Sequence, residues 1–260
     1  MMTKHYYFIS GLPRSGSTLL SSILKQNPRF HAGVSSPLLP LFRSIFEAVN
    51  NNNSPNSLNF SADKKIKLLK SAVDIYYEDF NKEVIFDTNR IWTNLLPQLK
   101  AVFPYTKIIL CVRDINRILD SFERLHQTNP LSISSVFPKD VDFNVYSRIT
   151  SLMKDDGIVR IPYESIKASF AGMYGSMLMF CEYDILTKNP EGTMKAIYKF
   201  IDQPYFNHDF NNVEDSYDDY DDQLQLPNLH KVRKKVLYEE KQFLIPPDIL
   251  NNYKDLEVWR

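Results

Sequence analysis

Residues 6–24 constrain the fold of this chain more than any other stretch. The segment opens with a short apolar run, YYFI, which is typical of a buried β-strand. A turn of small residues follows from Gly11 to Gly16, and Ser17 and Thr18 then begin a segment with apolar residues at helical spacing. Glycine lets backbone N–H groups approach a ligand, and a helix N-terminus favours negative charge. The strand, turn and helix therefore predict an anion site, with an ordinary strand-to-helix turn as the alternative.

The turn is close to the nucleotide-binding pattern G-x-x-x-x-G-K-[ST], with Gly11 and Gly16 at its two glycine positions. Ser17 occupies the position of the lysine, and the only cation inside the turn is Arg14. Nucleoside triphosphatases need that lysine on the β- and γ-phosphates, so its absence argues against ATP hydrolysis. The remaining prediction is a phosphate cradle with one guanidinium directed at a leaving oxygen.

Length and composition limit the class of protein. The 260 residues can build one large α/β domain with a substantial core, and the formal net charge of zero gives no sign of a nucleic-acid partner. No apolar run is long enough to span a bilayer, and the N-terminus lacks the layout of a signal peptide, so we expect a cytoplasmic protein. Cys111 and Cys181 lie in apolar runs and are expected to be buried free thiols, and no spacing indicates a metal site.

Apolar runs and helical spacing alternate along the chain. Buried strands are expected at 6–9, 84–86, 107–112 and within 177–183, with a short strand or loop at 30–34 and a turn or short strand at 158–161. Helices are expected over 17–26, 38–49, 62–80, 94–103, through 117–122 and over 190–201. We therefore predict a single domain, residues 1–260, with a P-loop-like three-layer α/β/α fold around a mostly parallel sheet. An acidic loop near 211–226, which we expect to be mobile, and a basic, helical C-terminal tail complete it.

A second anion site is expected after the apolar run at 107–112. Arg113 follows that run directly, and Ser121 comes about two helical turns later. Arginine can pair with a phosphate through two hydrogen bonds, and a serine hydroxyl can add one. The alternative is that Arg113 pairs with Asp114 or a helix end. Because ligands bind at the carboxyl ends of parallel strands, 11–18, 87–90 and 113–114 should converge on one edge.

These motifs resemble those of sulfotransferases that use 3′-phosphoadenosine-5′-phosphosulfate (PAPS). The turn, GLPRSGST, is similar to their 5′-phosphosulfate loop, and Val112 to Ser121 resembles their 3′-phosphate site. The segment from Tyr183 to Ile201 looks like their Tyr-Glu-x-Leu…Pro segment. The resemblance covers roughly residues 5–205 and is nearest to bacterial sulfotransferases related to tyrosylprotein sulfotransferases.

The resemblance implies transfer of a sulfonate from PAPS to a hydroxyl or amine of a small molecule, without a metal. It implies that backbone N–H groups of Ser15, Gly16, Ser17 and Thr18 hold the 5′-phosphate while Arg14 stabilises the bridging oxygen. Arg113 and Ser121 would bind the 3′-phosphate, and Tyr183 would contact the nucleotide. The family often adds a late basic motif to that phosphate, for which Arg233 and Lys234 are the candidates. The alternative for 231–235 is the solvated start of a basic helix.

The chain departs from the family where a general base is expected. Small-molecule sulfotransferases have Lys-Thr-His after the second strand, whereas this chain has Asp87-Thr88-Asn89. The glutamate that tyrosylprotein sulfotransferases place after the first helix is also missing. A desolvated Asp87 is the first candidate for the base, with a structural acid as the alternative, and Asn89 could orient the acceptor. His31 and His126 are weaker candidates.

The acidic run from Glu214 to Asp222 suggests two hypotheses about the acceptor. It is either a solvated loop or a lid that attracts a cationic small molecule, such as a guanidinium alkaloid toxin, sulfonated on an amine or guanidinium nitrogen. Two other functions remain open, a P-loop-type small-molecule kinase and a non-catalytic nucleotide-binding relative. The oligomeric state is not predicted.

Overall fold

The computed structural model describes residues 4–51, 60–129, 136–137, 144–170, 172–213, 215, 217–225 and 227–260. Its centre is a five-stranded sheet in the order β2-β3-β1-β4-β5, and all four pairings are parallel. The strands are β1 (His5–Gly11), β2 (Phe30–Ala32), β3 (Val84–Thr88), β4 (Ile108–Val112) and β5 (Leu178–Glu182). The predicted parallel sheet is confirmed, and the short run at 30–34 does contribute an edge strand.

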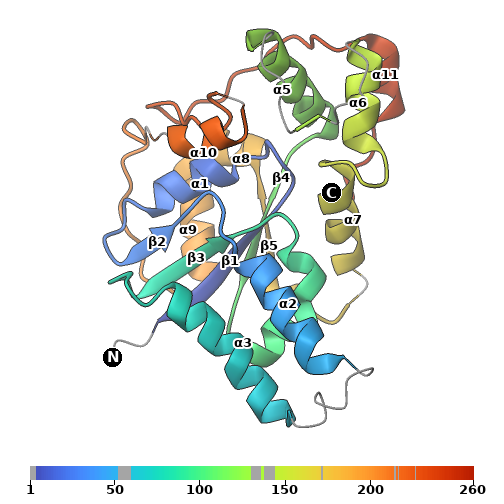
Figure 1. The fold of residues 1–260 in the computed structure, drawn as a ribbon. Coiled ribbons are helices and arrows are strands. Elements are labelled where there is room, and N and C mark those ends of the chain that lie inside the picture. The colour runs from blue at the N-terminus through green and yellow to red at the C-terminus, as the bar shows by residue number, and fades with distance from the viewer. Residues whose placement is uncertain are drawn as a thin grey trace.

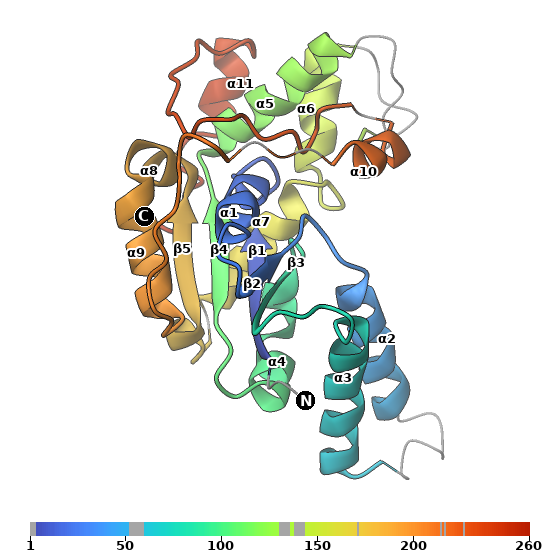
Figure 2. The ribbon, with the colours of Figure 1, turned by 90° about the vertical axis from the view of Figure 1, so that its left-hand side faces the viewer.

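Helices cover both faces of this sheet, as predicted (Figures 1 and 2). On one face α1 (Ser17–Leu24) and α9 (Pro190–Phe200) pack their apolar side chains into one cluster with the strands. On the other face the cluster includes α2 (Leu38–Asn50), α3 (Ala62–Tyr76), the 3-10 turn η2 (Trp92–Leu95) and α4 (Leu96–Val102). The three-layer α/β/α fold follows from these two apolar interfaces.

A third apolar cluster lies beyond the carboxyl ends of the strands (Figure 1). It joins α5 (Ile115–Thr128), α6 (Val145–Met153), α7 (Arg160–Ser169) and α11 (Pro247–Asn252). The remaining elements are η3 (Gly175–Met177), α8 (Tyr183–Lys188) and α10 (Asp218–Gln223). No helix among the described residues is both long and apolar enough to cross a membrane.

Of the two alternatives for residues 158–161 the turn is confirmed, and it leads into α7. Two other local expectations are wrong. The acidic run is not simply a loop, because it contains α10 and a bridge between Asp215 and Val232. Residues 231–235 are not a helix start, since Val232 belongs to that bridge. Tertiary pairing of the two segments with each other overrides what each sequence favours locally.

The end of β1 lies unusually close to β4. Gly11 has a φ of 125°, and a Cβ there would overlap the carbonyl oxygen of Cys111 and lie 2.7 Å from its backbone nitrogen. Leu12 N then donates a 2.9 Å hydrogen bond to that same carbonyl. Glycine therefore allows the turn to begin directly against the neighbouring strand.

Gly11→Ala should destabilise the protein by about 3 kcal/mol, because it combines a left-handed φ with a backbone clash. The melting temperature measured by calorimetry should fall by roughly 6–12 °C. Gly175→Ala is the matched control, because a Cβ at Gly175 would meet no atom within 4 Å. Equal melting temperatures for the two variants would contradict the prediction.

Candidate functional site

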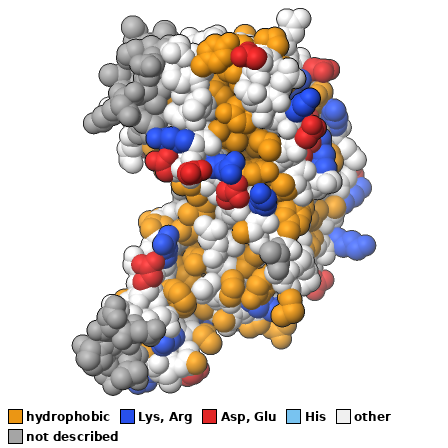
Figure 3. Space-filling view, turned by 90° about the vertical axis from the view of Figure 1, so that its right-hand side faces the viewer, with side chains coloured by type: hydrophobic (Ala, Val, Ile, Leu, Met, Phe, Trp, Pro, Cys, Tyr) orange, Lys and Arg blue, Asp and Glu red, His pale blue; other side chains and the backbone are white. Residues whose placement is uncertain are grey.

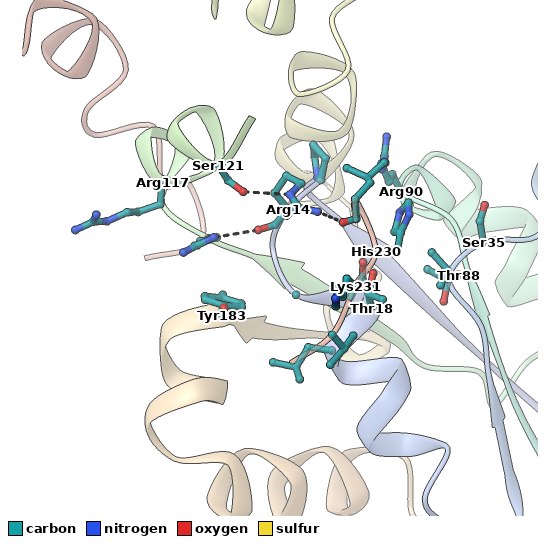
Figure 4. A pocket seen from close by; sticks show the side chains of 18 of the residues that line it. Arg14, Thr18, Ser35, Thr88, Arg90, Arg117, Ser121, Tyr183, His230 and Lys231 are labelled. Carbon is teal, nitrogen blue, oxygen red and sulfur yellow. Dashed lines mark hydrogen bonds between the residues drawn. The ribbon is translucent and has the colours of Figure 1, made fainter. Parts of the chain in front are cut away.

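A cavity of about 660 Å³ lies at the carboxyl ends of β1, β3 and β4. Its lining includes the Gly11–Gly16 turn and the start of α1, residues 88–91 after β3, α5, the start of α8 and a late segment, residues 229–241. The three polar strand ends that the sequence predicts to converge therefore do line one cavity. Figure 4 shows how side chains from these separate elements face it.

The turn presents backbone N–H groups to this cavity. Arg14 and Gly16 have positive φ values of 58° and 92°, which direct the chain sharply into α1. Gly16 is the N-cap of α1, and no side chain caps the helix and no acidic residue lies in its first turn. The first-turn N–H groups thus remain available to an anion. The Ser15 hydroxyl is already used, because its single proton is shared between the carbonyl oxygens of Leu12 and Cys111, at 2.5 and 2.8 Å from Oγ.

Arg14 is held in the middle of the site by two side-chain contacts. Its Nε donates to the Oγ of Ser121 at 3.1 Å, and its Nη1 donates to the carbonyl oxygen of Leu229. Burial, followed by the nearby charge of Arg113, lowers the pKa of Arg14 to about 10. That pKa still lies well above neutrality, so Arg14 remains a cation.

Arg113 stacks on Tyr183, with its Cζ 4.1 Å from the ring centroid. One guanidinium nitrogen donates to the Arg14 carbonyl at 3.4 Å, whereas the buried Nε has no hydrogen-bond partner among the described residues. Asp114 forms no ion pair with Arg113, and its side chain instead caps α5 by accepting from Arg117 N at 2.8 Å. A Cβ on Gly16 would lie 2.7 Å from the Tyr183 ring, so the turn, the ring and Arg113 form one closely packed unit.

Positive charge dominates the lining. Nine basic side chains and two acidic ones belong to it, namely Arg14, Arg90, Arg113, Arg117, Arg124, Lys231, Arg233, Lys235 and Lys241 with Asp120 and Glu239. The two acids already pair with lining cations, Asp120 with Arg124 and Glu239 with Arg233. Among the described residues, Arg14, Arg90 and Arg113 form no ion pair with a carboxylate. Because buried cations are normally paired, their arrangement calls for an anionic ligand.

The cavity brings together most residues that the sequence predicts for the site. Its lining contains Arg14, Gly16, Ser17, Thr18, Asn89, Arg113, Ser121, Tyr183 and Arg233. Ser15 contributes to the turn from behind the lining, and Lys234 lies between two lining residues without belonging to the lining itself.

Asp87 is not brought to the cavity. Its side chain is buried on the face of the sheet that α2, α3 and α4 cover. There it accepts hydrogen bonds from Tyr77 and Trp92, both at 2.7 Å. Burial raises the pKa of Asp87, yet the carboxyl group has no access to the site. The reason is strand alternation, because Asp87 shares a face with Ile85, while Phe86 and Thr88 point the other way. The geometry therefore supports the structural alternative for this residue.

The two weaker candidates for the base also lie outside the cavity lining. His31 packs edge-on against Phe80, and burial lowers its pKa to about 4. His126 lies on α5 with its ring against Phe137.

Sequence reasoning missed two parts of the site. Arg90 falls within the strand end 87–90 that is expected at the site but no role is predicted for it, although its place two residues after β3 gives it the same access as Asn89. His230 was overlooked beside the basic residues that follow it, and its partner Asp221 was assigned to a solvated run. Position after a strand brings Arg90 to the site, whereas no spacing motif connects Asp221 with His230.

Comparison with known proteins assigns this chain to a protein family. The model of the sulfotransferase family matches residues 7–207, so the chain belongs to the sulfotransferase family. Its fold is similar to that of a sulfotransferase from Alicyclobacillus acidocaldarius, with 12% identity, a TM-score of 0.51, and coverage of 86% of this chain and 90% of that one. The sulfotransferase domain of the curacin biosynthetic pathway is also similar, with 17% identity, a TM-score of 0.50, and coverage of 78% and 75%. A search of curated proteins finds no significant match.

Arg113→Met should weaken binding of inorganic pyrophosphate about 10- to 100-fold in the absence of magnesium. The variant keeps an apolar contact with Tyr183 but loses hydrogen bonds of a charged donor, each worth roughly 1.5–3 kcal/mol. Isothermal titration calorimetry measures the affinity. Arg43→Met is the control, because Arg43 is exposed on α2 and pairs with Glu47 outside the cavity lining. Equal affinities for both variants would argue against Arg113 as an anion ligand.

Proposed function

We propose that this sulfotransferase uses PAPS as its donor and transfers the sulfonate to a small molecule. The observation that carries the proposal is the group of Arg14, Arg90 and Arg113 around one cavity without carboxylate partners. A donor with phosphate at both ends would satisfy these charges. The unpartnered Nε of Arg113 and the close fit of Gly16 against Tyr183 support a phosphate and a ring of the nucleotide at this end.

The residues then divide the work between holding the donor and stabilising charge. Backbone N–H groups of residues 15–18 would hold the 5′-phosphate, and Arg113, Ser121 and Arg233 would hold the 3′-phosphate. Arg14 would stabilise negative charge on the bridging oxygen, as fixed donors do in other transfers with a loose transition state. PAPS supplies an activated sulfonate attached to a phosphate leaving group, so we propose that no metal is needed. Lys234 remains a candidate for a further 3′-phosphate ligand at the edge of the cavity.

The acceptor end of the cavity is proposed to accept a hydroxyl or amine. Figure 4 shows Ser35, Thr88 and Arg90 on the side of Arg14 away from Tyr183 and Arg117. Asn89 also belongs to the lining and could orient the acceptor. We place the reaction in the cytoplasm, as a tailoring step on a small molecule.

The hypothesis of a cationic acceptor, such as a guanidinium alkaloid toxin, gains no support from the lining. Within the described part of the acidic run, only Tyr220 belongs to the lining. Asp215 pairs with Lys25, and Asp221 is buried against His230. A cationic acceptor would instead meet Arg90. Neutralising the exposed Asp219 and Asp222 should consequently leave the KM of such an acceptor unchanged.

3′,5′-Adenosine bisphosphate should stabilise the protein in the presence of EDTA. At 100 times the Kd the gain is about 2.7 kcal/mol, which corresponds to a rise in melting temperature of roughly 5–10 °C. Differential scanning calorimetry measures the shift. Stabilisation by ATP with magnesium alone would instead indicate a small-molecule kinase. Binding of the bisphosphate without transfer of labelled sulfonate from PAPS to any acceptor, including water, would indicate a non-catalytic relative.

A further inference from the structure

A histidine–aspartate pair lies at the acceptor end of the cavity. The Nδ1 of His230 is 2.5 Å from Oδ1 of Asp221, and the other carboxylate oxygen accepts from the backbone N–H of His230 at 2.9 Å. Asp221 comes from α10 and is 1% exposed. One buried carboxylate thus fixes both the backbone and the ring of His230.

This pairing determines which ring nitrogen is free. A carboxylate accepts the proton on Nδ1, so the Nε2 of neutral His230 carries a lone pair. No described residue hydrogen bonds to Nε2, and His230 belongs to the cavity lining. Figure 4 shows the ring on the same side of Arg14 as Arg90, Ser35 and Thr88, away from Tyr183.

Arg14 and His230 are connected by one peptide. Arg14 donates through Nη1 to the carbonyl oxygen of Leu229, and the next residue is His230. The cation proposed for the leaving oxygen and the free imidazole nitrogen are consequently set relative to each other by the backbone. Asp87, His31 and His126 lack this placement, since none of them belongs to the lining.

We propose that His230 is the general base of the sulfonate transfer and that Asp221 is its positioning residue. The inference rests on the proposed function, because it assumes a sulfonate donor in the cavity. Nε2 of His230 takes the proton of the acceptor hydroxyl or amine while the acceptor atom forms a bond to sulfur. The bond from sulfur to the bridging oxygen breaks, and that oxygen keeps the electron pair as part of the bisphosphate product. His230, now an imidazolium paired with Asp221, later releases the proton to water.

The surroundings keep His230 neutral before the reaction. Burial lowers the pKa of His230, and the charges of Arg14 and Arg90 lower it further, while Asp221 acts in the opposite direction. The ring of Tyr220 packs against the imidazole with 5.2 Å between centroids, and the neighbouring Lys231 also belongs to the lining. At neutral pH the imidazole can therefore accept a proton, and its paired carboxylate stabilises the charge that forms.

Release of labelled sulfate from PAPS to water tests the base without an identified acceptor. His230→Asn should lower this rate about 100-fold, within the usual range for general-base catalysis. The acidic limb of the pH–rate profile, set by the lowered pKa of His230, should disappear. Affinity for 3′,5′-adenosine bisphosphate should change less than about threefold. His126→Asn is the matched control and should leave the rate unchanged, because His126 lies outside the lining.

Asp221→Asn provides a second readout that is independent of turnover. The new amide can donate to Nδ1 of His230, which then accepts and leaves the ring proton on Nε2. This tautomer has no lone pair on Nε2 with which to take the acceptor's proton. Nitrogen-15 NMR of the unliganded protein should show a lone-pair Nε2 in the wild type and a protonated Nε2 in the variant. The signal is assigned by its loss in His230→Asn. The rate of sulfate release should fall roughly 10- to 100-fold in Asp221→Asn.

The outcomes separate the inference from the proposed function. If the wild type does not bind the bisphosphate, PAPS is not the donor, and the proposed role of His230 fails as well. If the wild type binds the bisphosphate and His230→Asn releases sulfate at the wild-type rate, PAPS remains the proposed donor, but His230 is not the general base. A protonated Nε2 in the wild type would also overturn the inference, even if the melting temperatures of both variants are too low for rate measurements.

Discussion

The site depends on positive charge that the protein buries without neutralising. Burial lowers the pKa of Arg14 to about 10, and the same cause lowers the pKa of Arg90 and Arg113. A guanidinium with a pKa of about 10 is still charged at neutral pH, so desolvation does not remove the unfavourable charge. A bound anion does remove it, and the most favourable anion is one that reaches several arginines at once. The unliganded cavity therefore favours a multiply charged ligand before any specific hydrogen bond is considered.

The fold keeps these cations apart from acids by using the nearby acids elsewhere. Asp114 caps α5, and Asp120 pairs with Arg124 while accepting from the backbone of Leu244 at 2.5 Å. Arg117 and Arg124 donate to backbone carbonyls of Lys241 and Gln242, which holds the C-terminal segment across α5. Strand alternation sends Asp87 to Tyr77 and Trp92 on the far face of the sheet. Elsewhere the charges are mixed, and Figure 3 shows Lys and Arg beside Asp and Glu on one outer face.

The sequence was sufficient for the sheet, its parallel direction and the convergence of Arg14, Gly16 and Arg113 on one cavity. Local signals carry those features, because β1 and β4 are visible as apolar runs. The turn with Arg14 and Gly16 follows β1, and Arg113 directly follows β4. The side of the cavity proposed for the acceptor depends on residues that only tertiary structure brings together. Asp221 and His230 meet because a short helix folds back on an extended segment, and neither residue belongs to a periodic pattern. Asp87 was misleading because a strand end alone does not say which face a side chain takes.

The late segment, residues 229–241, connects the two ends of the cavity. Its Leu229 carbonyl holds Arg14, and its His230 and Arg233 belong to the lining. Asp221 in turn holds His230, so α10 stabilises the segment through a buried hydrogen-bonded pair. An acidic run that looks like a solvated loop thus supports one side of the cavity through Asp221. In the proposed mechanism, backbone geometry therefore holds Arg14 and His230 close to each other before a substrate binds, so that little entropy is lost in orienting them.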